Sequence, residues 1–257
     1  MNELTAEQAR RAIVEYTRRM ADAAVTSGPD TVVPTTPGWT VTEVVEHLGQ
    51  TQHWVAEIIE RRITDPAKLP TGMAVLPGDP EDWPAWLAGS AERVANAFAG
   101  EALDAEVFNA AGDERTGARF WMSSVLNETV VHGFDVSGAT DIDAGVAAAL
   151  VSNHLAMLTS PTWNMLRSES AHALRGDGQT LQWRATDIDG AWFVQRRPDG
   201  ANWQQAIRPA DVTVAGPASA LLLTLTRRLP LGGHRVTVDG DAELVRHWLG
   251  NTAHVAG

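Results

Sequence analysis

Glu128 and His132 are four residues apart in a stretch with helical periodicity, and this pair is the first place in the sequence where chemistry is suggested. Four helical residues turn about 400°, so the two side chains point about 40° apart and lie about 6 Å apart along the axis. Side chains placed in this way can hold one metal ion. His47 lies in another apolar stripe that also predicts a helix. Imidazole and carboxylate ligands from facing helices are a recurrent way to bind a metal inside a bundle.

Two simpler interpretations compete with this metal site. A histidine on an apolar stripe is often a hydrogen-bonded core residue, and a Glu–His pair at i, i+4 is often a solvated pair. Against the second interpretation, Glu128 shares its stripe with Trp121 and Val125, and a buried carboxylate needs a compensating partner. Such a His2Glu set would leave a coordination position for water or substrate, as catalytic sites do. Composition and spacing alone leave the alternatives open.

The sequence contains no cysteine, which limits the chemistry available to it. Disulfides, cysteine nucleophiles and thiolate-bound zinc are excluded, so a metal must bind to His, Asp or Glu. Any reaction of a thiol must use a thiol from outside the protein.

The first half of the chain predicts four amphipathic helices that would position these residues. The first helix starts at a Thr5/Gln8 capping box, and a second capping box, Thr40/Glu43, starts the next. The predicted helices cover residues 5–26, 40–63, 83–99 and 118–137. Four helices joined by loops predict a bundle.

The pattern changes near residue 141, where short strands enter. Helices are predicted over residues 144–158, 218–228 and 242–249, and strands over residues 181–186, 191–197, 211–215 and 235–238. The predicted fold is therefore α+β: a metal-binding four-helix bundle at residues 1–140, then a small α+β domain with a mostly antiparallel sheet at residues 141–257.

Charge and hydropathy exclude some partners. Residues 1–140 carry 10 basic and 21 acidic side chains, and the rest of the chain carries 10 and 11, so neither half offers a basic face to nucleic acid. The apolar runs are too short to span a bilayer. The first residues lack the pattern of a signal peptide, so we expect a cytoplasmic protein without a membrane partner.

Two segments resemble the mycothiol-dependent maleylpyruvate isomerase family, which belongs to the DinB-like metal-binding bundles. Residues 39–48 read WTVTEVVEHL and resemble the start of its histidine-bearing helix, and residues 127–135 read NETVVHGFD and resemble its E-x-x-x-H-G-x-D signature. Residues 210–217 and 238–241 are similar to parts of its C-terminal domain, whose fold is similar to sterol carrier proteins. The resemblance assigns a divalent metal, usually zinc, to His47, Glu128 and His132.

The resemblance also implies the activity. A low-molecular-weight thiol, mycothiol in actinobacteria, would be the cosubstrate, and the product would be either an isomer or an S-conjugate of a small electrophile.

Asp135 is expected to hydrogen-bond His132 or its neighbours, with helix-end solvation as the alternative. Arg227 and Arg228 are candidates for binding an acidic substrate or thiol, with helix capping as the alternative. A non-catalytic small-ligand binding protein, with a structural metal or none, remains the other functional class. The electrophile and the oligomeric state stay open.

Overall fold

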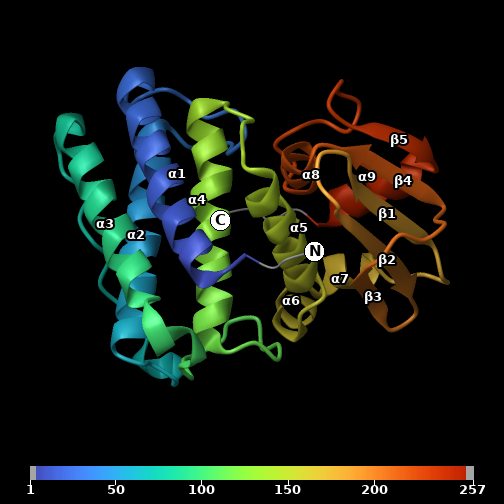
Figure 1. Ribbon diagram of the computed structural model, residues 1–257, viewed down its shortest axis with the longest axis horizontal. Helices are drawn as coiled ribbons and strands as arrows, with labels where there is room; N and C mark the ends of the chain where they lie inside the picture. The colour runs from blue at the N-terminus through green and yellow to red at the C-terminus, as the bar shows by residue number, and fades with distance from the viewer. Residues whose placement is uncertain (1–3, 253–257) are drawn as a thin grey trace. The chain divides into compact units, whose positions relative to one another are not determined.

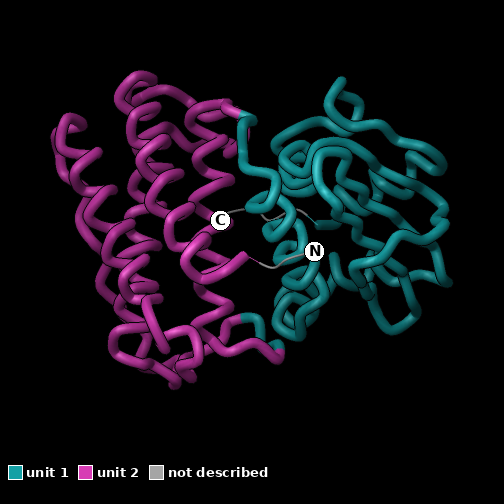
Figure 2. Tube along the Cα trace, viewed as in Figure 1, with its two compact units in different colours: residues 1–3, 111–113, 140–257 teal, residues 4–110, 114–139 magenta. Residues whose placement is uncertain are grey.

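The computed structural model describes residues 4–252, which form two compact units (Figure 2). One unit, the bundle, holds residues 4–110 and 114–139, and the second unit holds residues 111–113 and 140–252. The first three and last five residues of the predicted domains lie outside the described chain.

Four long helices make up the bundle (Figure 1). They are α1 (Ala6–Ser27), α2 (Val41–Glu60), α3 (Trp83–Ala97) and α4 (Gly117–Ser137). Helix α1 packs against α3 and α4, and α2 packs against the same two helices. Each helix turns an apolar stripe inward, and Ile13, Leu48, Leu87 and Val125 from the four helices are fully buried. The predicted bundle is confirmed.

Local hydrogen bonds set the ends of the helices that carry the candidate ligands. The Glu43 carboxylate accepts the Thr40 backbone N–H at 2.6 Å, which starts α2 where the capping pattern predicts. At the end of α4, Gly138 adopts a left-handed conformation and its N–H bonds the Phe134 carbonyl at 2.7 Å. Helix α4 therefore ends just beyond the NETVVHGFD segment.

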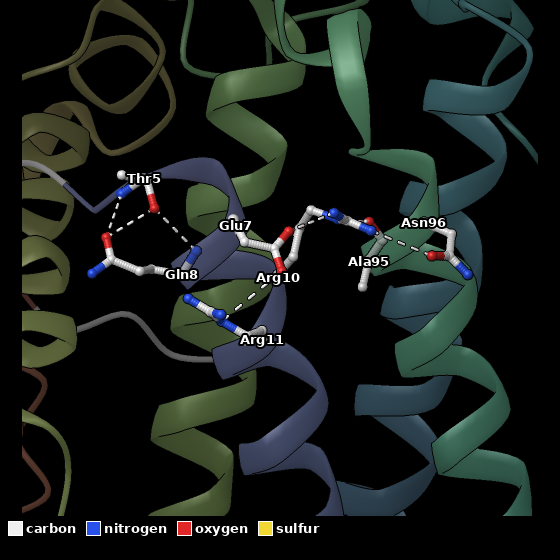
Figure 3. A network of polar contacts seen from close by, with 7 residues as sticks. All are labelled: Thr5, Glu7, Gln8, Arg10, Arg11, Ala95 and Asn96. Carbon is white, nitrogen blue, oxygen red and sulfur yellow. Dashed lines mark hydrogen bonds and ion pairs between the residues drawn. The ribbon is translucent and has the colours of Figure 1, made fainter.

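An arginine of α1 binds the end of α3 (Figure 3). Arg10 donates from Nε to the Ala95 carbonyl at 2.5 Å and from Nη1 to Glu7 at 2.8 Å. The last turn of α3 has no basic residue of its own, and the cation of Arg10 is placed where the helix dipole favours positive charge. In the same view, Thr5 and Gln8 form the predicted capping box of α1.

Helix α2 is shorter than predicted. It ends at Glu60 rather than near residue 63, because Arg62 adopts a left-handed conformation with φ of 50°. The loop that follows contains the short 3-10 turns Pro66–Lys68 and Pro80–Asp82. This loop is held on α2 by Trp54, which donates to the Pro70 carbonyl at 2.9 Å. A further 3-10 segment, Gly100–Asp104, precedes α4.

The second unit is a five-stranded sheet with helices. The strands are β1 (Thr180–Ala185), β2 (Ala191–Arg197), β3 (Gly200–Gln205), β4 (Val212–Gly216) and β5 (Thr237–Gly240). Their order is β3-β2-β1-β4-β5, in which only β1 and β4 run parallel, so the mostly antiparallel sheet is confirmed. The helices are α5 (Ala144–Leu158), α6 (Pro161–Leu166), α7 (Ser168–Ala173), α8 (Ala218–Leu225) and α9 (Ala242–Asn251). Helix α8 packs against α5, β1 and β4.

Several details of this unit differ from the prediction. Strand β3 and helices α6 and α7 were not predicted, and β5 begins two residues later than predicted. Helix α8 ends at Leu225 rather than at residue 228, because Arg227 is left-handed with φ of 64°. Across residues 4–252, no helix combines the length and hydropathy needed to cross a bilayer.

Candidate metal site

Helices α2 and α4 bring His47, Glu128 and His132 together. One ligand atom from each residue lies within 4.8 Å of the other two, and within residues 4–252 these three form the one group of histidine and carboxylate side chains with that property. The Oε2 atom of Glu128 lies 3.0 Å from Nε2 of His47 and 3.2 Å from Nε2 of His132. A single carboxylate oxygen thus faces both imidazoles, which lie with ring centroids 5.0 Å apart.

A chain of hydrogen bonds orients His132 from behind. Its Nδ1 lies 2.9 Å from Oδ2 of Asp135, and the other oxygen of Asp135 accepts a hydrogen bond from the Thr35 hydroxyl at 2.6 Å. A carboxylate on one ring nitrogen fixes the orientation of the imidazole and leaves the other nitrogen directed at a ligand. Asp135 therefore holds Nε2 of His132 toward Glu128.

Trp39 forms an aromatic wall beside the two histidines. Its ring lies 6.0 Å from that of His132, stacked at 21°, and 5.2 Å from that of His47, tilted at 56°. The residue lies just before Thr40, the N-cap of α2, and its backbone is fixed by hydrogen bonds with Val33 at 2.9 Å and Thr36 at 3.0 Å. The ordered loop between α1 and α2 thus supplies both Trp39 and Thr35.

Burial is uneven across the cluster. The side chains of His132 and Asp135 are 4% and 0% exposed, whereas those of His47 and Glu128 are each 33% exposed. The cluster is therefore enclosed around His132 and Asp135 and reachable from solvent at His47 and Glu128. This arrangement suits a site that binds a further molecule better than one closed by protein ligands alone.

The electrostatics of the cluster favour charged forms. Burial raises the pKa of Glu128, but hydrogen bonds with His132 and His47 outweigh burial and hold that pKa well below its ordinary range. Burial lowers the pKa of His132, but hydrogen bonds with Asp135 and Glu128 outweigh it and raise the pKa to about 9. A proton on His132 thus compensates the two carboxylates when no other cation is bound.

The donor set fits a divalent cation such as zinc. Zinc binds imidazole nitrogen and carboxylate oxygen at about 2.0–2.2 Å in a tetrahedral arrangement, which places ligand atoms about 3.3 Å apart. The two Glu128–histidine distances, 3.0 and 3.2 Å, are close to that spacing. A cation would also take over the charge compensation that the proton on His132 otherwise provides. His47, Glu128 and His132 are therefore a donor set that could hold such an ion.

Arg227 and Arg228 belong to the second unit and follow the end of α8. Arg227 is exposed, and Arg228 donates to the Thr226 carbonyl at 3.0 Å. The contact of Arg228 is the helix-end capping that was the alternative interpretation. Binding of an acidic ligand by either arginine stays a prediction.

Two residues of the site had no predicted role. Thr35 lies 100 residues before its partner Asp135, and a threonine in a loop carries no periodic signal. Trp39 belongs to the segment that carries the family resemblance, but only the fold shows that its ring contacts both imidazoles.

Comparisons with known proteins agree with this architecture. The model of the mycothiol maleylpyruvate isomerase N-terminal domain matches residues 10–137, and the model of the corresponding C-terminal domain matches residues 134–247. A crystal structure of the mycothiol-dependent maleylpyruvate isomerase is similar with a TM-score of 0.60 at 16% identity, covering 93% of this chain and 96% of that one. A histidine-to-alanine mutant of that enzyme gives a TM-score of 0.57 at 14% identity with the same coverage.

Among curated protein sequences, none matches the chain significantly. Because the identity to the solved structures is low, their similarity shows a shared fold alone. Membership of the family is shown by the two domain models, which together span most of the sequence. The chain belongs to the mycothiol-dependent maleylpyruvate isomerase family.

Proposed function

We propose that this protein is a metal-dependent enzyme that uses a low-molecular-weight thiol, such as mycothiol, to isomerise or S-conjugate a small electrophile. The observation that carries the proposal is the partly exposed His47–Glu128–His132 cluster, in which one carboxylate oxygen faces two imidazole nitrogens. The thiol must come from solution, because the chain has no cysteine. Membership of the family supports mycothiol as the first thiol to test.

The residues divide the work of such a site between them. The ion would be held by His47, Glu128 and His132. From this donor set we expect zinc first. When bound there, the ion would favour the thiolate form of a coordinated thiol at neutral pH. Asp135 keeps the imidazole of His132 oriented, and Trp39 packs its ring beside both imidazoles.

The same first step leads to either product. A thiolate that adds to an activated cis double bond forms a C–S bond and moves the electron pair onto the neighbouring carbonyl group. Rotation about the new single bond and expulsion of the same thiolate give the trans isomer. Protonation of the carbon instead gives the S-conjugate. The electrophile decides between these outcomes, and Arg227 and Arg228 are our candidates for binding its acidic groups.

Turnover with an external thiol tests the proposal. The metal-loaded protein is mixed with mycothiol and maleylpyruvate, the electrophile that gives the family its name, and the isomer and any S-conjugate are separated and quantified. We expect product only when metal and thiol are both present. If maleylpyruvate is not consumed, another small electrophile with an activated double bond takes its place in the assay. Thiol bound without turnover of any electrophile would instead favour the small-ligand binding protein.

A further inference from the structure

A layer of four polar side chains crosses the interior of the bundle. Each helix contributes one residue: Thr17 from α1, Gln52 from α2, Ser90 from α3 and Thr129 from α4. All four are 0% exposed. We call this set the polar layer. Buried polar side chains are costly unless hydrogen-bonded, so their partners decide what the layer does.

The amide of Gln52 connects the other three helices. Its Nε2 donates to the hydroxyl of Thr17 at 2.8 Å and to that of Thr129 at 3.2 Å, and its Oε1 accepts from the hydroxyl of Ser90 at 2.6 Å. Thr129 uses its own proton on the Val125 carbonyl at 2.8 Å, so it can only accept from Gln52. This fixes which end of the amide faces α4. Both amide hydrogens are thereby used, and the amide oxygen shares the proton of Ser90 with the Leu87 carbonyl, which lies 2.9 Å from the same hydroxyl.

The polar layer lies next to the candidate metal ligands along both helices that carry them. On α4, Thr129 directly follows Glu128 and precedes His132 by three residues. On α2, Gln52 follows His47 by five residues, about 7.5 Å along the axis. The Gln52–Thr129 hydrogen bond is therefore a direct link between α2 and α4 close to the point where their ligands meet.

Apolar packing alone would hold the two helices less specifically. Contacts between valine and leucine side chains are non-directional, and a small slide or rotation replaces them with similar contacts. The polar layer is satisfied in one register only, because any slip leaves a buried amide or hydroxyl without its partner. A metal site tolerates such a slide no better than the polar layer does, since its ligand atoms must keep their spacing within a few tenths of an ångström.

From these contacts we infer that Gln52 is a positioning residue for the metal site, which fixes the register of α2 against α4 so that His47 meets Glu128 and His132. The inference rests on the proposed function for the role of the three ligands. It concerns this chain's own residues, however, and the geometry of the imidazoles can be followed without any metal.

The test replaces the whole polar layer by apolar side chains of similar shape: Thr17→Val, Gln52→Met, Ser90→Ala and Thr129→Val together. Removing all partners at once leaves no unsatisfied group, so the variant should keep or exceed the thermal stability of the parent protein. Its affinity for Co²⁺ should nevertheless fall at least about tenfold, and the visible absorption bands of bound Co²⁺ should broaden. In the metal-free protein, the imidazole NMR signals of His47 and His132 should double or broaden.

Val94→Ala is the matched control. Val94 is fully buried in α3, which carries no candidate ligand, and its apolar side chain makes none of the hydrogen bonds of the polar layer. Its truncation therefore lowers stability while those hydrogen bonds stay in place. We expect an unchanged Co²⁺ spectrum and sharp imidazole signals in this control. The fourfold variant should thus keep its stability and lose its metal geometry, whereas Val94→Ala should lose stability and keep its metal geometry. A merely structural role of the polar layer would not produce this pattern.

If the fourfold variant does not fold, Thr129→Val alone provides the Co²⁺ and imidazole readouts, with a smaller change in the same direction. Its stability should fall, because one amide hydrogen of Gln52 loses its acceptor. Unchanged imidazole signals and Co²⁺ affinity in whichever variant folds would overturn the inference. A parent protein that binds no divalent metal would refute the proposed function instead, and the imidazole signals of the metal-free variants would still decide whether Gln52 sets the register.

Discussion

In the bundle, ionisable side chains from α2 and α4 converge on one point, whereas in the second unit Asp187 and Arg196 bind separate helix ends. Asp187 accepts the Ala218 N–H at 2.9 Å where α8 begins. Arg196 donates to the Ala173 carbonyl at 2.9 Å and the Leu174 carbonyl at 3.2 Å where α7 ends. Each of these charges is matched to unpaired backbone groups of a helix terminus.

The contrast separates structural charge from charge that is available to a ligand. Glu128 has two imidazoles as its partners, and a third of its side chain remains exposed. Charges that contact each other and remain partly open can exchange a proton for a cation or a substrate. The predictions below test whether the metal chemistry belongs to the bundle and what the second unit adds.

The largest effect is expected from the ligands themselves. The purified protein should contain about one divalent ion per chain, and His47→Ala or His132→Ala should remove most of it, because two remaining ligands bind too weakly. Elemental analysis measures this directly. The control is His53→Ala, since His53 lies on α2 but contacts Trp86 and Arg93 instead. Full metal content in both ligand variants would refute the assignment.

Next in size is the response to the thiol. Mycothiol should bind with release of a proton near neutral pH, because a metal site favours the thiolate. Calorimetry in two buffers of different ionisation enthalpy measures that proton. The metal-free protein is the control and should bind mycothiol much more weakly. Equal heats in the two buffers, or equal binding without metal, would mean that the site does not activate the thiol.

A smaller change is expected at Asp135, behind His132. Asp135→Asn keeps the shape of the side chain but removes the negative charge that faces Nδ1 of His132. The loss of such a partner typically lowers metal affinity about 10–100-fold. Thr35→Val removes only the hydroxyl that binds the far oxygen of Asp135, so its effect should be weaker. Competition with a chelator of known affinity ranks the two. A stronger effect of Thr35→Val would show that the loop, rather than the charge of Asp135, controls His132.

The pH dependence of the metal-free protein should follow His132. Its raised pKa means that its contribution to stability is complete below pH 6.5 and is lost as the pH rises through about 9. Glu128 acts in the opposite direction, since its contribution is present above pH 4.5 and is lost only in strong acid. Denaturant titrations between pH 6 and 10 should therefore show a loss of about 1–3 kcal/mol. His132→Gln should remove that slope, and a slope that persists in this variant would assign it elsewhere.

The sequence predicted which candidate ligands the fold brings together better than it predicted the residues around them. The Glu128/His132 spacing and the capping boxes are local, so the four bundle helices and their inward faces could be predicted from neighbouring residues. The contact between Thr35 and Asp135 joins residues 100 positions apart and has no periodic signature. Strand β3 was missed for a related reason: it is largely exposed and is defined by its hydrogen bonds with β2 rather than by alternating apolar residues.

Helix ends were also mispredicted where glycine was absent. Helices α2 and α8 end earlier than predicted, and the left-handed residues that follow them are Arg62 and Arg227. Left-handed C-terminal residues are usually glycine, so an arginine gives no warning of the end. Within residues 4–252 these two are the non-glycine residues with positive φ, one in each unit.

The smallest effect is expected from these two arginines, of which Arg62 lies in the bundle and Arg227 in the second unit. Glycine adopts positive φ without steric cost but loses more entropy on folding, so Arg62→Gly and Arg227→Gly should each change stability by no more than about 1 kcal/mol. If Arg227 binds an acidic group of substrate or thiol, Arg227→Gly should also raise KM several-fold at unchanged metal content, whereas Arg62→Gly should not. Thermal melts, elemental analysis and initial rates on both variants measure the three quantities. Equal KM values would leave Arg227 as a strained helix end without a ligand, and would restrict the chemistry of this chain to the bundle and to Arg228.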